Sequence, residues 1–217
     1  MILLASGSPR RAELLRRQGI DFHVMPSHID ESVFEAESPP DYVLRLAQSK
    51  ALAGITGIAK QDEHYKLVLA ADTSVAIDDQ ILGKPESFDH FEHMMNTLSG
   101  RSHQVFTGVA VVSSRSISEN SSGLEINSQD APLSEESLVV QTTVTFDQLS
   151  KQKIQAYWHS GEPQDKAGGY GIQGLAEEFV TRIDGSYSNV VGLPVFETMQ
   201  LLASVGVHGL LGGDVTE

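Results

Sequence analysis

The segment from Leu67 to Ile77 constrains the fold of this chain more than any other part of the sequence. It is apolar and rich in β-formers, and a run of this kind favours a buried β-strand. Three polar residues, Asp72, Thr73 and Ser74, interrupt the run, and a turn signal follows at Asp78-Asp79. We predict that this segment is the principal strand of the fold.

Segments typical of strands and helices alternate along most of the chain. The other expected strands are Met1 to Ala5, Asp21 to Met25, Gln104 to Val112, Leu138 to Phe146 and Phe179 to Ile183; the expected helices run from Pro9 to before Gly19, from Pro39 to about Ala53, from Phe88 to Leu98, from Ser150 to about His159 and from Val195 to Val205. This alternation favours an α/β architecture with helices on both faces of a mixed sheet.

One stretch departs from the pattern, between Ser113 and Ser137. It is rich in serine and contains no aromatic residue, so it has little with which to build a core. We predict that residues 113–137 form a flexible insertion, placed as a long hairpin loop. The chain as a whole, residues 1–217, is predicted to form a single domain.

Composition excludes several classes of protein. The chain contains no cysteine, which rules out disulfides, thiolate metal sites and a cysteine nucleophile. Asp and Glu outnumber Lys and Arg by 29 to 15, a balance that repels long polyanions such as DNA or RNA. No apolar stretch is long enough to cross a bilayer, and the arginines follow the first apolar residues, the wrong order for a secretory signal. We expect a cytoplasmic protein with no membrane and no nucleic-acid polymer as partner.

A loop of small residues, Ser6-Gly7-Ser8-Pro9, links the first expected strand to the first expected helix. Free backbone N–H groups and the positive dipole end of a helix suit a bound phosphate. Arg10 and Arg11 lie in the first helical turn, where positive charge is unfavourable unless an anion offsets it. Either a phosphate site or a solvated pair of arginines explains this pattern equally well.

Asp72 lies where the principal strand is most buried, so its carboxylate must be paired, bound to a metal or placed at an open sheet edge. Asp30 and Glu31, which alone would be surface residues, are able to hold a hard divalent cation if the fold brings them near Asp72. Lys50 interrupts an apolar helical stripe and either extends to water or points into a site. The local sequence pattern around Lys84 indicates only an ordinary charged residue in a loop.

The stretch Gly169-Tyr170-Gly171-Ile172-Gln173-Gly174 has the spacing of a dinucleotide-binding loop but lacks its context. It follows a hydrophilic segment instead of a strand, and no helix pattern comes after it, so we reject that interpretation. The glycines permit close approach of a ligand, and Gln173 offers the donor and acceptor that recognise a base edge. The histidines show no metal-type spacing and are predicted to lie at the surface.

Six blocks of residues stand out together. They are Leu4-Ala5-Ser6-Gly7-Ser8-Pro9-Arg10-Arg11, Ala71-Asp72-Thr73, Gly83-Lys84-Pro85, Leu98-Ser99-Gly100, Asp165-Lys166-Ala167-Gly168-Gly169-Tyr170-Gly171-Ile172-Gln173-Gly174 and Gly185-Ser186-Tyr187-Ser188-Asn189-Val190-Val191-Gly192-Leu193-Pro194. In order and spacing they resemble the Maf family of nucleoside triphosphate pyrophosphatases as far as about Leu202. The resemblance implies a fold similar to that of inosine triphosphate pyrophosphatases: a mixed, curved sheet flanked by helices, with a cleft between two lobes.

The resemblance also implies a substrate. The branch that acts on dTTP and UTP carries an arginine, a threonine and a glutamine at its specificity positions, which correspond to Arg10, Thr73 and Gln173. The branch that acts on 7-methyl-GTP is less similar, with a tryptophan after Ser-Pro and a glutamate in place of the glutamine. The further site residues implied are Asp72 as proton acceptor, with Glu31, Lys50 and Lys84.

The expected reaction converts a nucleoside triphosphate to the monophosphate and pyrophosphate. In it, Mg²⁺ or Mn²⁺ is held by Glu31 and Asp72, Asp72 orients the attacking water, and Ser6 holds a phosphate. Arg11 joins the lysines in offsetting phosphate charge. A homodimer is the family expectation. Two alternatives stay open: a housekeeping enzyme for modified pyrimidine nucleotides, and a non-catalytic, nucleotide-binding regulator of cell division.

Overall fold

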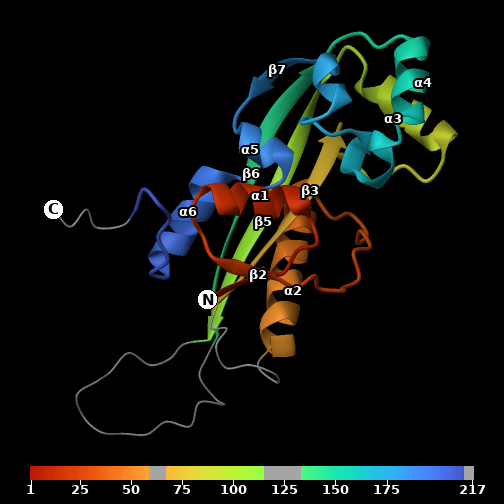
Figure 1. The fold of residues 1–217 in the computed structure, drawn as a ribbon. Helices are drawn as coiled ribbons and strands as arrows, with labels where there is room; N and C mark the ends of the chain where they lie inside the picture. Colours follow the sequence, from red (N-terminus) through yellow and green to blue (C-terminus); the bar gives the residue numbers. More distant parts are fainter. Residues whose placement is uncertain (59–66, 115–132, 213–217) are drawn as a thin grey trace, which may run out of the picture.

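The structure, a computed structural model, describes residues 1–58, 67–114 and 133–212. One seven-stranded sheet runs through this part of the chain, with the order β2-β1-β3-β5-β6-β7 and with β4 paired to β3 (Figure 1). The strands are β1 (Ile2–Leu4), β2 (Phe22–Val24), β3 (Leu67–Ile77), β4 (Gln80–Leu82), β5 (Ser102–Ser114), β6 (Leu133–Phe146) and β7 (Val180–Asp184). Strand β1 is parallel to β2 and β3, whereas the other pairs are antiparallel. The predicted mixed sheet is confirmed.

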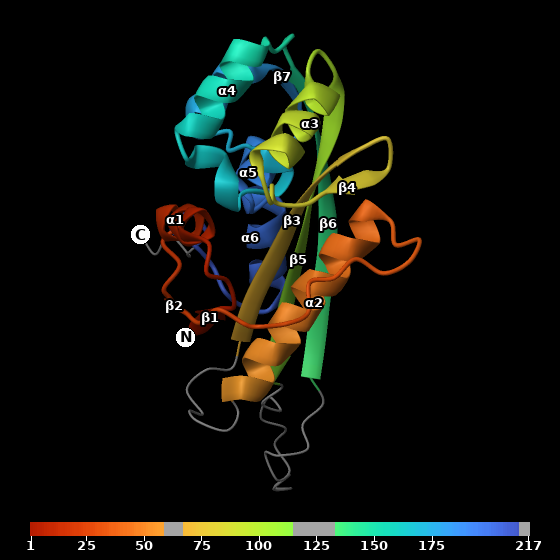
Figure 2. The same cartoon turned by 90° about the vertical axis from the view of Figure 1, so that its right-hand side faces the viewer.

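Helices cover both faces of this sheet. The α-helices are α1 (Pro9–Arg17), α2 (Pro39–Ile58), α3 (Phe88–Leu98), α4 (Lys151–His159), α5 (Tyr187–Val191) and α6 (Val195–Ser204), and short 3₁₀ helices span Glu162–Asp165, Ala167–Gly169 and Leu175–Phe179. Helix α2 lies along the face opposite to α1 and α6 (Figure 2). No helix in the described ranges is both long and apolar enough to cross a membrane.

Alternation along β3 explains how both faces are packed. Leu69 and Ala71 join the core formed with α1 and α6, whereas Val68 and Ala70 join the core formed with α2. Successive side chains of a strand point to opposite faces, so an unbroken apolar run supplies two cores. The apolar sequence of the principal strand therefore reflects burial on both sides.

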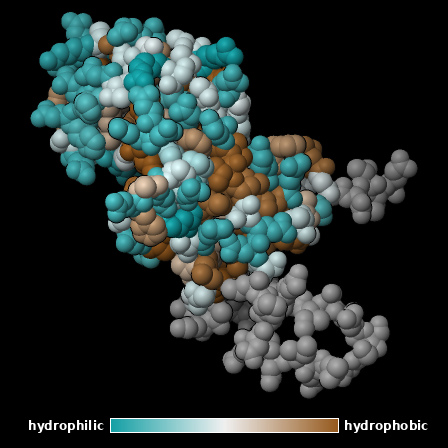
Figure 3. Space-filling view, turned by 180° about the vertical axis from the view of Figure 1, so that it is seen from behind, coloured by the Kyte–Doolittle hydropathy of each residue, from teal (hydrophilic) through white to brown (hydrophobic). Residues whose placement is uncertain are grey.

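The molecule has two lobes joined by the long strands β3, β5 and β6 (Figures 1 and 2). A third core cluster packs α3 and α4 against the far ends of these strands, with Phe91, Phe146 and Tyr157 among its buried rings. Seen from behind, hydrophilic side chains cover this lobe, whereas hydrophobic side chains are exposed in the middle of the molecule (Figure 3). The long strands thus hold the two lobes at opposite ends of one shared sheet.

Several predicted boundaries were wrong. Helix α2 continues beyond Ala53 to Ile58, because Ile55 extends the buried stripe and tertiary packing outweighs the glycines that follow. Strands β5 and β6 continue to Ser114 and from Leu133, into the segment predicted as a flexible insertion, because their antiparallel ladder needs only backbone groups. The rest of that insertion, residues 115–132, lies outside the described residues.

The prediction that the histidines lie at the surface was wrong for His103. This residue of β5 is fully buried against the rings of Phe146 and Tyr170, and its Nε2 lies 2.7 Å from the Tyr170 hydroxyl. Burial lowers the pKa of His103 to about 4, so the imidazole is neutral at physiological pH. His103 thus serves here as a hydrogen-bonded core residue.

Candidate active site

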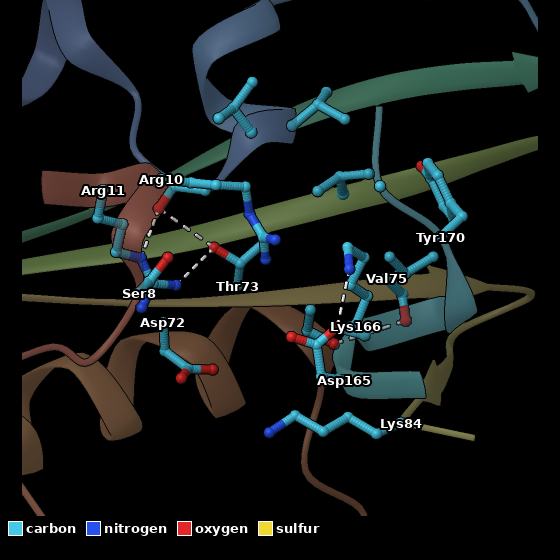
Figure 4. Close-up of a pocket in the computed structure, with 18 of the residues that line it drawn as sticks. Ser8, Arg10, Arg11, Asp72, Thr73, Val75, Lys84, Asp165, Lys166 and Tyr170 are labelled. Carbon is cyan, nitrogen blue, oxygen red and sulfur yellow. Dashed lines mark hydrogen bonds and ion pairs between the residues drawn. The ribbon is translucent and has the colours of Figure 1, made fainter. Parts of the chain in front are cut away.

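A cleft of about 980 Å³ opens between the two lobes. Its walls come from the β1–α1 loop, the loop before α2, the middle of β3, the β4–α3 loop and the segment from 162 to 174. The predicted substrate-binding and catalytic residues all line it: Ser6, Arg10, Arg11, Glu31, Lys50, Asp72, Thr73, Lys84 and Gln173. Asp30, the other carboxylate considered for a cation, does not line it; it is exposed and accepts a hydrogen bond from the Ser32 amide over 2.9 Å. The fold therefore brings together side chains that are spread over most of the sequence (Figure 4).

The register of the sheet explains why a carboxylate interrupts a buried strand. On one edge of β3, pairing with β1 ends at Leu69 and pairing with β4 begins at Val75. Asp72 lies in the interval between these ladders, on the edge that faces the cleft. Only 8% of Asp72 is exposed, so the residue is buried yet borders the cavity.

Lys50 connects two carboxylates. Its Nζ lies 2.6 Å from Asp72 Oδ1 and 2.6 Å from Glu31 Oε1. The lysine projects from α2 and is almost fully buried. The sequence left open whether Lys50 extends to water or points into a site; its side chain points into the cleft and pairs there.

The Arg11 guanidinium is fixed by three hydrogen bonds. Nε donates to Gly192 O over 2.7 Å, Nη1 to Ser6 Oγ over 3.0 Å, and Nη2 to Thr73 Oγ1 over 2.9 Å. Burial lowers the pKa of Arg11 from its ordinary value, although the charge of Asp72 opposes this effect. A guanidinium keeps its charge even so, and this one is held rigidly at the cleft wall.

Glu31 reaches the cleft from the loop before α2. Burial opposes its ionisation, but the hydrogen bond and charge of Lys50, with the charges of Lys84 and Arg11, outweigh that effect and lower the pKa of Glu31. Tyr42 of α2 donates from its hydroxyl to the backbone oxygen of Glu31 over 3.0 Å. Burial, then the charges of Asp72 and Glu31, raise the pKa of Tyr42 to about 12, so it remains a donor.

The opposite wall is built by the glycine-rich segment. Gly168 donates to the backbone oxygen of Gly83, which ties this segment to the loop that carries Lys84. Glu162 accepts from Tyr157 Oη over 2.8 Å and from the Leu175 amide over 2.9 Å, so it braces the turn on which the exposed Gln173 lies. No strand-to-helix unit is present at this segment, as its rejection as a dinucleotide-binding loop predicted.

The carboxylates can be tested for fit to a divalent cation. Within the described ranges, Asp72 Oδ2 and Glu31 Oε2 make no hydrogen bond, because Lys50 occupies only the other oxygen of each carboxylate. Those same ranges contain no group of three or more His, Asp or Glu able to hold a metal. Two carboxylates fit Mg²⁺ when the substrate and water supply its other oxygen ligands.

Sequence reasoning missed several residues of the cleft. Tyr42, Glu162 and Lys166 line it, and Lys166 Nζ lies 2.8 Å from Asp165 Oδ1. Lys166 was available from the sequence, since it lies in the same block as Gln173. Tyr42 gave no such signal, because an aromatic residue in an amphipathic helix is ordinarily a core residue.

Comparison with known proteins gives consistent findings. The sequence profile of the family described as Maf-like protein matches residues 1–205. A protein of Pseudoalteromonas atlantica, named dTTP/UTP pyrophosphatase, is 46% identical over 95% of this chain and 98% of its own length. Proteins of the same name from Vibrio parahaemolyticus and Acinetobacter baylyi are 49% and 45% identical, over 93% of this chain and 95% and 98% of theirs.

Among solved structures, the Ham1 protein of Staphylococcus aureus matches 67% of this chain and 71% of that chain. The sequence identity is 13% and the TM-score is 0.38. This likeness is low, and the architecture given above rests on the sheet of this chain alone.

Proposed function

This chain belongs to the Maf-like protein family, and from that premise we propose that its cleft hydrolyses dTTP and UTP to the nucleoside monophosphate and pyrophosphate. The observation that carries the proposal is the buried Asp72–Lys50 pair, with Glu31 also on Lys50, at the wall of a cleft that Arg11 and Lys84 line as well. A buried carboxylate beside fixed cations is what the hydrolysis of a phosphoanhydride requires.

The cations bind the triphosphate. Arg11 is oriented before any ligand arrives, because its hydrogen bonds to Ser6, Thr73 and Gly192 use three of its donors and leave others for phosphate oxygens. The amides of the first turn of α1 lack acceptors within the helix and add a neutral anion site next to Ser6. Lys84 enters from the other lobe and supplies charge from the opposite side.

Asp72 orients the water that attacks the α-phosphorus and accepts its proton. Oδ1 is held by Lys50, and Oδ2 is left to accept a hydrogen bond from the water. Glu31 and Asp72 would hold Mg²⁺ or Mn²⁺ through their carboxylates. Such a cation, when bound, offsets negative charge on the phosphate oxygens.

Base selection belongs to the exposed end of the cleft. Gln173 presents a carboxamide, whose donor and acceptor together match the edge of a uracil or thymine ring. Arg10 flanks the same cavity. Thr73 acts at one remove, since its hydroxyl contacts Arg11, Thr107 and Gly192 and so fixes the position of the guanidinium.

One assay tests this function. The purified full chain is incubated with dTTP, UTP, CTP, dATP, GTP, 7-methyl-GTP and 5-methyl-UTP, with Mg²⁺, with Mn²⁺ and with a chelator, and monophosphate and pyrophosphate are both quantified. We expect equal amounts of the two products from dTTP and UTP, and none with the chelator. Release of inorganic phosphate alone would contradict cleavage at the α-phosphorus. Tight binding without turnover would instead favour the non-catalytic regulator.

A cytoplasmic location and a homodimer complete the proposal. A nucleoside triphosphate substrate and a chain without cysteine are compatible with a reducing compartment. Hydrophobic side chains are exposed in the middle of the back face (Figure 3). An exposed hydrophobic surface of this kind supports the proposal that a second copy of the chain covers it. Light scattering coupled to size exclusion gives the mass in solution, and a value equal to one chain would contradict the dimer.

A further inference from the structure

The loop that carries Glu31 has no regular secondary structure of its own. It runs from Asp30 to Glu37, between β2 and α2, and is called the Glu31 loop below. Its residues 31–36 are exposed, and Ala36 adopts a left-handed backbone conformation with φ of 57°. Glu31 therefore needs contacts from outside the loop to reach Lys50 in one fixed position.

Arg45 of α2 provides most of those contacts. Its Nε lies 2.5 Å from Glu37 Oε1 and its Nη2 lies 2.8 Å from Glu37 Oε2, a two-pronged pair that fixes the end of the loop. Nη2 also donates to the backbone oxygen of Ser32 over 2.9 Å, next to Glu31 itself. One guanidinium therefore bridges both ends of the loop.

The pair is more than a solvated surface contact. Only 8% of the Glu37 side chain and 24% of the Arg45 side chain are exposed. The Arg45 guanidinium lies 3.8 Å from the centre of the Phe34 ring, and Glu37 Oε2 also accepts from the Phe34 amide over 3.0 Å. Half-buried two-pronged pairs of this kind fix geometry as well as charge.

The contacts of the Glu31 loop lead on to the carboxylates of the proposed active site. Ser32 follows Glu31 directly, and Glu31 Oε1 is 2.6 Å from Lys50 Nζ, which holds Asp72 at the same distance. Tyr42 anchors the backbone oxygen of Glu31 from the same helix, one turn before Arg45. Arg45, Tyr42 and Lys50 thus make α2 the rigid support of an otherwise irregular loop.

We propose that Arg45 is a positioning residue for the reaction: its guanidinium clamps the Glu31 loop at Glu37 and Ser32 and thereby places the Glu31 carboxylate on Lys50. Arg45 is absent from the cleft lining, so it acts only through Glu31. The proposal rests on the pyrophosphatase function above. Its two consequences are a kinetic coupling between Arg45 and Glu31 and a loop that loosens when the guanidinium is removed.

The kinetic test is a double-mutant cycle. Arg45→Met keeps the side-chain stem over Phe34 and removes the guanidinium, and Arg45→Lys keeps a charge without the two-pronged geometry. We expect each variant to lower kcat/KM for dTTP, on the order of tenfold for Arg45→Met, and to change it less than about twofold in a Glu31→Gln background. Arg101→Met is the control: Arg101 also pairs with a carboxylate, through Nη2 to both oxygens of Asp78, away from the cleft, and its replacement should leave wild-type kinetics.

The structural test needs no substrate. Hydrogen exchange of peptides that cover residues 30–37 is compared between the wild-type chain, Arg45→Met and Arg101→Met. The Phe34 and Glu37 amides are hydrogen-bonded within the loop, so their exchange should accelerate in Arg45→Met alone, while β3 is unchanged.

The outcomes separate the two claims. A wild-type chain that releases no pyrophosphate contradicts the proposed function, and loop exchange then decides the clamp by itself. Unchanged exchange in Arg45→Met overturns the clamp. So does an equal loss of kcat/KM with and without Glu31, because a merely structural arginine would lower activity by the same factor in both backgrounds. Full activity in Arg45→Lys would overturn the requirement for the two-pronged geometry.

Discussion

A buried lysine between two carboxylates is an expensive arrangement at the scale of single residues. Lys50 and Asp72 are each 8% exposed, and the removal of such charges from water costs about as much as their attraction returns. Apolar residues of similar volume would stabilise the fold equally well or better. The arrangement is therefore explained by reactivity and not by stability.

Replacement of Asp72 tests that explanation. Asp72→Asn keeps the side-chain volume but removes the proton acceptor and the charge, so kcat for dTTP should fall on the order of a hundredfold to ten-thousandfold. The fold should survive, because Lys50 keeps Glu31 as a partner. Pyrophosphate release and thermal unfolding are the measurements. Wild-type turnover in a folded variant would remove Asp72 from the mechanism.

The prediction for Gln173 concerns the preference among nucleotide substrates and not the overall rate. Gln173→Glu replaces a donor by a negative charge that accepts only, which weakens the match to a pyrimidine edge. We expect kcat/KM for dTTP and UTP to fall relative to GTP, on the order of tenfold for a lost pair of hydrogen bonds. Gln80→Glu, an exposed glutamine outside the cleft, is the control. An unchanged substrate ranking would show that Gln173 does not read the base.

At the scale of elements, local patterns predicted most of the fold. The bounds of β3 and α3 follow from composition and periodicity, and Ser150 accepts from the Lys153 amide as a helix cap, as predicted. Ser8 lies at the predicted cap position, but its side chain accepts no such bond; its amide donates to Ser6 Oγ. The extension of β5 and β6 was not predictable, since it depends on backbone pairing between distant segments.

The site was predictable only in part. Asp72 could be predicted as a site residue, because a carboxylate within an apolar strand must be paired, bound to a metal or placed at an open edge. Tyr42 and Arg45 carry no such signal, because their roles come from the path of the Glu31 loop, which no periodic pattern encodes. The unpaired edge of β3 that admits Asp72 to the cleft likewise depends on where β1 ends and β4 begins. Residue types suggest a site, whereas the register of the sheet determines which of them meet.

Gly108 governs the packing of α2 on the sheet. A side-chain carbon at this position of β5 would collide with the backbone of Val43 and come within 2.9 Å of the Leu44 amide nitrogen. Gly108→Ala should therefore displace α2 and destabilise the fold by about 1–3 kcal/mol. Activity should fall too, because α2 carries Lys50. Gly83→Ala, where nothing lies within 4 Å of an added carbon, is the stability control. Equal melting temperatures for both variants would contradict this close approach.

For the whole molecule, charge is distributed unevenly. The formal net charge is −14, yet Arg10, Arg11, Lys50, Lys84 and Lys166 all line one cleft. Five carboxylates line the same cleft, namely Glu31, Asp72, Glu86, Glu162 and Asp165, so the cleft has no net formal charge while the molecule as a whole is acidic. An acidic surface repels long polyanions, whereas cations placed within a concave site still attract a small one. The acidic composition therefore predicted that no nucleic-acid polymer is a partner. The cations in the cleft explain why a small phosphate substrate remained compatible with that composition.

The buried His103 should make the stability of the whole fold depend on pH. Its pKa is about 4 when folded against 6.5 for an ordinary histidine, so between these values the unfolded chain binds a proton that the folded chain does not. Stability is then complete above pH 6.5 and falls as the pH drops toward 4, by about 1.4 kcal/mol per unit and about 3 kcal/mol in all. His103→Gln retains a polar group opposite Tyr170 Oη but does not titrate. Urea unfolding at pH 7.5, 6.5 and 5.5 should therefore show a shallower loss of stability in this variant, even if its stability at pH 7.5 is lower. Parallel curves for the two proteins would mean that His103 is not the group whose burial makes folding sensitive to acid.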